Sequence, residues 1–142
     1  MDLDDAIRTA EQLAASVRDT GVQPAYAELE TAIRGFQEEG YPLESILPQG
    51  SDARLGFSMR SADGRTFFQI YAALLRKSLC GADGEFNKLI KSGTSSSVGA
   101  ILGAMVIALG IPPIALGIMV PVAAIIANLG LDSFCEMTKP EG

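Results

Sequence analysis

The fold is decided by residues 92–131, which read SGTSSSVGAILGAMVIALGIPPIALGIMVPVAAIIANLGL. This stretch contains no charged residue, and from residue 98 onward its only strongly polar side chain is that of Asn128. Proline lacks a backbone N–H and clashes with the preceding helical turn, so the pair Pro112-Pro113 interrupts the run. The sequence therefore predicts an apolar helical hairpin over residues 93–131, broken at Pro112-Pro113.

One interpretation places this hairpin in a lipid bilayer. The uncharged run is about twice as long as the roughly 20 residues that one helical span needs. Its arms, residues 96–111 and 114–131, rise about 24 and 27 Å at 1.5 Å per residue. The hydrocarbon core of a bilayer is about 30 Å thick, so arms of this length predict incomplete insertion or local thinning of the bilayer.

Small residues recur at intervals of four in both arms, a spacing that lets helix backbones approach closely inside a membrane. Asn128 has two open interpretations: it bonds a neighbouring helix in the membrane, or it lies near enough to the helix end to reach water. The residues predicted to shape the hairpin, in a bilayer or in a protein core, are Gly99, Gly103, Ala104, Pro112, Pro113, Gly117, Pro121, Ala123, Ala127 and Asn128.

A second interpretation makes the hairpin the core of a helical bundle. A helix that is apolar all round must be buried all round. Only three or four short amphipathic helices are available to cover two apolar ones, so some apolar surface is expected to remain open. Self-association or a protein partner would then cover it, because large exposed apolar patches usually mark interaction sites. The two interpretations can also describe two states of one protein.

Charge is distributed unevenly along the chain. Residues 1–52 carry a net charge of −8, residues 53–92 carry +4 and residues 93–142 carry −2, which gives the total of −6. The basic residues closest to the hairpin are Arg76, Lys77, Lys88 and Lys91. These four residues are expected to form a basic patch next to the membrane. By the positive-inside rule, the patch predicts that the protein is cytoplasmic, at or in the cytoplasmic face of the inner membrane. Alternatively, the basic segment pairs with the acidic first 52 residues.

The region before the hairpin, residues 1–92, is predicted to be mainly helical. Apolar residues at helical spacing predict a first helix that Asp2 caps and Gly21 ends. A second helix has Pro24 in its first turn and ends at residues 38–40, before a single turn near residues 43–47.

A third helix is predicted from about Thr66, and a short fourth around residues 86–90. Residues 54–60 alternate in polarity like a strand, without a clear partner. The expected fold is thus all-α, with a possible short β element at residues 54–60, and a short charged tail over residues 132–142 follows the hairpin.

Composition excludes several classes of function. The chain has no histidine, which removes Ser-His-Asp and Cys-His nucleophiles and most zinc sites. Its net charge of −6 argues against nucleic-acid binding, which needs a basic face. Two cysteines, Cys80 and Cys135, are too few for a disulfide framework, and two buried free thiols are favoured over a bridge between them. We expect no catalytic residue, no metal site and no cofactor.

These observations predict a protein that is not an enzyme and that associates with or inserts into a membrane, as a conditionally released effector that perturbs the bilayer. Its predicted partners are a lipid bilayer, further copies of itself, or a protein. The alternative is a soluble helical adaptor or oligomerisation module whose hairpin is the core and whose exposed groove binds a protein partner.

Overall fold

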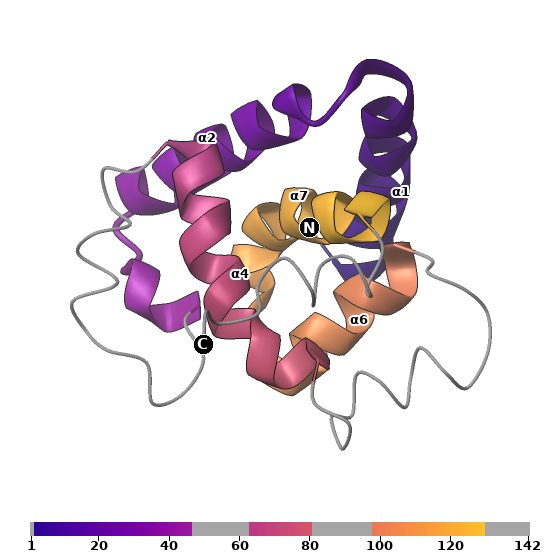
Figure 1. Ribbon diagram of the computed structural model, residues 1–142. Coiled ribbons are helices and arrows are strands. Elements are labelled where there is room, and N and C mark those ends of the chain that lie inside the picture. The colour runs from indigo at the N-terminus through magenta and orange to yellow at the C-terminus, as the bar shows by residue number, and fades with distance from the viewer. Residues whose placement is uncertain (1, 47–62, 81–97, 130–142) are drawn as a thin grey trace, which may run out of the picture.

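A computed structural model describes residues 2–46, 63–80 and 98–129, and within these ranges the chain forms five α-helices and no strand (Figure 1). The all-α prediction is confirmed. The elements are α1 (Leu3–Thr20), α2 (Gln23–Glu38), the 3₁₀ turn η1 (Leu43–Ile46), α4 (Gly64–Cys80), α6 (Val98–Leu109), the 3₁₀ turn η2 (Pro113–Ala115) and α7 (Leu116–Leu129). The predicted strand at residues 54–60, the short helix around residues 86–90 and the charged tail lie outside the described residues.

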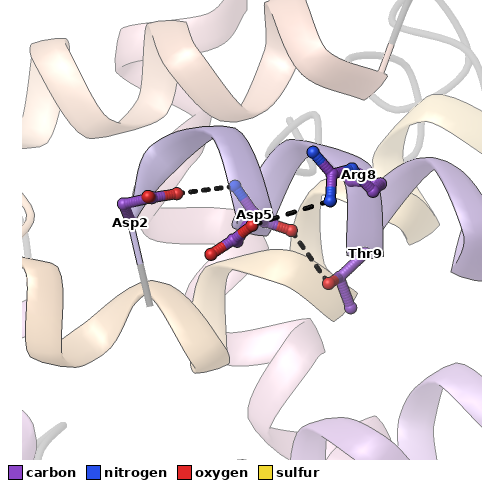
Figure 2. Close-up of polar contacts among 4 residues, drawn as sticks. All are labelled: Asp2, Asp5, Arg8 and Thr9. Carbon is purple, nitrogen blue, oxygen red and sulfur yellow. Dashed lines mark hydrogen bonds and ion pairs between the residues drawn. The ribbon is translucent and has the colours of Figure 1, made fainter.

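Helix α1 has the caps that the sequence predicts. The backbone N–H of Asp5 donates to the side chain of Asp2 over 2.8 Å (Figure 2). Gly21 ends the helix with a φ of 97°. Most of the predicted apolar face is buried, and its buried members are Ala6, Ala10, Leu13, Ala14 and Val17.

Helices α2 and α4 are also set by local signals. Pro24 lies in the first turn of α2, and the stripe from Ala25 to Phe36 is buried at helical spacing. Helix α4 begins two residues before the predicted Thr66, because Asp63 caps it: the Thr66 N–H donates to the Asp63 carboxylate over 2.7 Å. This hydrogen bond lowers the pKa of Asp63 below the usual carboxyl value.

The hairpin bends over a longer segment than the sequence predicts. Helix α6 ends at Leu109, because Gly110 adopts a φ of 63° and the Ile111 N–H donates back to the Val106 carbonyl over 3.1 Å. The chain then passes through η2 before α7 begins. The helical arms therefore contain 12 and 14 residues, so both are shorter than the predicted arms. Across the described residues, no helix combines the length and the apolarity that a membrane crossing requires.

Helix α7 lies at the middle of the molecule, with α1, α2, α4 and α6 around it (Figure 1). It packs against α1, α2 and α6, and the two arms of the hairpin contact each other. Ten of its 14 residues are buried, namely Leu116 and residues 118–126. The second arm of the hairpin thus forms the core of the described structure, while the first arm packs against both α1 and α7.

Substitution of Gly64 by alanine is expected to lower the free energy of unfolding by about 2–3 kcal/mol, the usual cost of overpacking. A Cβ atom at Gly64 would collide with the backbone carbonyl of Tyr26 and lie 3.3 Å from the Glu30 nitrogen, and helix backbone cannot move aside cheaply. Urea unfolding measures this change. The matched control is Gly35→Ala in α2, where a Cβ meets nothing within 4 Å and the higher helix propensity of alanine should stabilise. Equal effects of the two variants would contradict the close α2–α4 contact.

Candidate functional site

The surroundings of the hairpin are almost entirely apolar. No polar or charged residue is buried among the described residues. The two described ion pairs, Arg8–Asp5 at 3.8 Å and Arg34–Glu30 at 3.1 Å, each lie within one helix on its exposed side. Helices α1, α2 and α6 are therefore held to α7 by apolar contacts, and not by charge pairs that cross between the described helices.

Tyr71 of α4 makes the described side-chain hydrogen bonds that join separate elements. Its hydroxyl donates to the Ile46 carbonyl over 2.7 Å and lies 3.7 Å from the Met119 sulfur of α7. Burial raises the pKa of Tyr71, so the hydroxyl keeps its proton and remains a donor. The single proton of this hydroxyl thus links α4 to the end of η1, and its longer contact with the Met119 sulfur is the described polar contact that reaches the hairpin.

The first arm approaches α1 through a glycine. A Cβ atom at Gly99 would lie 2.9 Å from Cγ2 of Ile7 and 3.7 Å from the carboxylate of Glu11. A Cβ atom at Gly103, one turn further along, would meet nothing within 4 Å. The small residues of α6 therefore differ in role: Gly99 admits α1, and Gly103 borders open space. Ala104 lies in α6, with its side chain outside the described part.

The bend of the hairpin presents apolar surface to water. Ile114 is 52% exposed, Pro113 is exposed and Pro112 is half-buried. A pocket of about 310 Å³ lies under this bend, where the beginning of α1 meets α6 and α7. Its lining residues are Asp2, Leu3, Val106, Ile111, Pro113 and Leu116. The bend is therefore an uncharged apolar end of the hairpin that the outer helices leave open.

Along α7, the predicted hairpin residues have different surroundings. Pro121 and Ala123 are buried, and Ala127 is half-buried. Asn128 is exposed one residue before the end of the helix, so in this structure it reaches water. Gly117 is exposed although every other residue from 116 to 126 is buried.

Gly117 forms part of the floor of an open groove between α1, α2 and α7, which we call the Gly117 groove. The groove has a volume of about 430 Å³, and its lining residues are Thr9 of α1, Ala27, Glu28, Thr31 and Ala32 of α2, and Gly117 and Val120 of α7. The sequence pointed to Gly117 but not to the α2 residues, because their meeting depends on how α1 and α2 diverge over α7 (Figure 1).

Few polar groups in the Gly117 groove are available to a ligand. The Thr9 hydroxyl donates to the Asp5 carbonyl over 2.9 Å (Figure 2), and the Thr31 hydroxyl donates to the Ala27 carbonyl over 3.0 Å. The Gly117 carbonyl lacks its helical donor, because the residue four positions later is Pro121, which has no N–H. The Gly117 carbonyl, which has no donor at residue 121, and the exposed Glu28 carboxylate therefore remain as acceptors.

The predicted basic patch is only partly within the described structure. Arg76 and Lys77 lie in the last turns of α4, with side chains outside the described part, and Lys88 and Lys91 lie beyond it. Cys80 is the last residue of α4, and Cys135 is outside the described ranges.

No family model, no curated protein and no solved structure matches this chain. The features of the chain that bear on its function are therefore the hairpin, its apolar surroundings and the Gly117 groove.

Proposed function

We propose that the protein stores an apolar helical hairpin, α6–η2–α7, and releases it into one side of a lipid bilayer, thereby perturbing the membrane without catalysing a reaction. The observation that carries the proposal is the character of the contacts around the hairpin. The hairpin is uncharged from residue 98 to residue 129, and the described helices enclose it through apolar side chains.

Apolar contacts are the ones that a bilayer can replace. Lipid tails are as apolar as leucine side chains, so a hairpin that leaves α1, α2 and α4 for hydrocarbon finds an equivalent environment. Breaking a buried ion pair would strand a charge and cost several kcal/mol, but no buried charge is present in the described core. Among the described hydrogen bonds, release of α7 gives up only the long contact between Tyr71 and Met119.

The exposed bend supplies a leading end for insertion. Ile114 and Pro113 already face water, and no ionisable side chain lies between them and either end of the described hairpin. At 1.5 Å per residue, arms of 12 and 14 residues are about 18 and 21 Å long, which exceeds one leaflet of about 15 Å. A hairpin that enters the bilayer with its bend leading would keep both of its ends on the side of the membrane from which it entered.

Acid is the trigger that the charges favour. At neutral pH the net charge of −6 repels an anionic bilayer, and the charge falls to zero near pH 4.5. The pKa of Asp63 is lowered by its hydrogen bond to the Thr66 N–H, so the folded state prefers the ionised form. The stabilisation from this cap is present above the usual carboxyl pKa and is lost only as the pH falls through the lowered value, so it is largely retained at pH 4, where the trigger is the loss of net negative charge.

Purified protein mixed with dye-loaded vesicles tests the proposal. We expect flotation with anionic vesicles and release of dye at pH 4, with little of either at pH 7, and weaker effects on zwitterionic vesicles. A protein that neither floats nor releases dye at either pH would refute the proposal. A defined oligomer on size-exclusion chromatography, together with no vesicle binding, would instead support the self-associating adaptor.

A further inference from the structure

We infer that the Gly117 groove is a docking site for a basic amphipathic helix of another protein. The inference does not depend on bilayer insertion, because a protein that ignores vesicles can still bind such a helix. Its basis is the shape of the groove, the charge around it and the two acceptors on its surface.

The groove is open and mostly apolar, as a helix-binding surface must be. Its wall on α2 is formed by Ala27, Glu28, Thr31 and Ala32, three of which have small side chains that leave room beside the helix. The floor exposes Gly117 of the central helix, where a Cβ atom would meet nothing within 4 Å. An amphipathic helix binds by laying its apolar face in such a groove, with contacts repeated every three to four residues.

The charge around the groove selects a basic partner. Residues 2–40, which include α1 and α2, carry nine acids and three arginines, a net charge of −6. Two of those arginines, Arg8 and Arg34, already pair with acids of their own helices. A second copy of this surface would be repelled, whereas a lysine-rich helix would be attracted by the net negative charge of α1 and α2, which form two sides of the groove, and by Glu28 in its lining.

The two acceptors give lysine specific positions to bind. An ammonium group offers three donors, which suit a carboxylate and a carbonyl that lacks its own donor. Glu28 supplies the carboxylate, and Gly117 supplies the carbonyl that Pro121 leaves without a helical partner. The hydroxyls of Thr9 and Thr31 donate within their own helices, so the rest of the wall is effectively apolar.

Fluorescence anisotropy with a labelled 14-residue helical peptide of alanine, leucine and lysine tests the inference. Leucine occupies one face of this probe and lysine flanks it, and the comparison probe has glutamate in place of lysine. We expect saturable binding of the lysine peptide at 0.15 M salt and at least tenfold weaker binding of the glutamate peptide. Equal binding of the two peptides, or no binding of either, would overturn the inference.

Variants of the intact protein locate the binding surface. Gly117→Leu should weaken binding of the lysine peptide at least tenfold, because the new side chain occupies the groove. Gly103→Leu is the matched control, since its Cβ also meets open space in an apolar helix, and it should bind like the unmodified protein. Thr31→Phe, at an exposed position, fills the groove from α2 and should reproduce the effect.

Glu28→Gln should weaken binding about fivefold, as expected for one exposed ion pair, while Glu38→Gln outside the groove should change it little. Circular dichroism establishes that each variant is folded. If the Gly117 and Thr31 variants bind the lysine peptide as well as the Gly103 variant does, the peptide binds elsewhere on the acidic surface. The assignment of the groove as its binding site is then wrong.

Discussion

Replacement of Gly103 by lysine is expected to reduce acid-triggered dye release about 100-fold while the protein stays folded, because a charge at the middle of a membrane-embedded helix costs about 2.5–3.5 kcal/mol. Gly103 is the sixth of the 12 residues of α6, so its side chain would be carried into hydrocarbon with the hairpin. In the folded protein this position is only half-buried, and a Cβ there meets nothing within 4 Å. A lysine at this position can extend its ammonium group into water.

The matched control for this substitution is Gly35→Lys in α2. It has the same net charge and equally open space at its Cβ, but it lies in a helix that is not part of the hairpin. We expect it to release dye like the unmodified protein, which separates the cost of insertion from altered attraction to anionic lipid. If Gly103→Lys is folded by circular dichroism and releases dye as well as Gly35→Lys does, α6 does not enter the bilayer.

Local signals were sufficient to predict the amphipathic helices. Asp2, Gly21 and Pro24 each act on the backbone within a few residues of their own position, so caps and helix starts can be predicted from the sequence alone. The predicted start of α4 is too late because helical apolar spacing begins only at Phe67. The cap at Asp63 lies before that spacing, and the structure reveals it through the hydrogen bond from the Thr66 N–H.

The length of the hairpin arms was overestimated for a different reason. Apolar character over residues 98–111 does not measure helix length, because apolar composition does not stop a helix. Gly110 stops it, because glycine adopts the positive φ that ends α6 two residues before the prolines. A glycine two positions before a proline was the available signal.

Which arm forms the core could not be deduced from composition. Both arms are apolar all round, and the choice depends on which outer helices reach each of them. Helix α1 contacts α6 and α7, whereas α2 covers α7. The Gly117 groove was unpredictable for the same reason: Glu28 and Gly117 are 89 positions apart, and only the angle between α1 and α2 leaves space above them.

A disulfide between α1 and α6 is expected to abolish dye release completely and reversibly. The variant is Ile7→Cys with Gly99→Cys, in a chain whose Cys80 and Cys135 are replaced by serine. The geometry suits a bond, because a Cβ at Gly99 lies 2.9 Å from Cγ2 of Ile7, the place that a cysteine sulfur can take. In a disulfide, each Cβ lies about 3 Å from the sulfur of the other residue.

The bond should block release because α1 cannot follow the hairpin into hydrocarbon. Glu11 lies 3.7 Å from the same Cβ position, so a tethered α1 would bring its carboxylate, and those of Asp4 and Asp5, to the membrane with α6. Closing a loop of about 90 residues should also raise the free energy of unfolding by about 4 kcal/mol.

The measurement compares one sample of the double-cysteine variant, oxidised and then reduced, on anionic vesicles at pH 4. Oxidised protein should release no dye, and reduction should restore release to the level of Ile7→Cys alone in the same background. This single-cysteine control shows whether the loss of the Ile7 side chain has an effect of its own. Equal release before and after reduction would mean that dye release does not require α6 to separate from α1, which would contradict the release of a stored membrane-inserting hairpin.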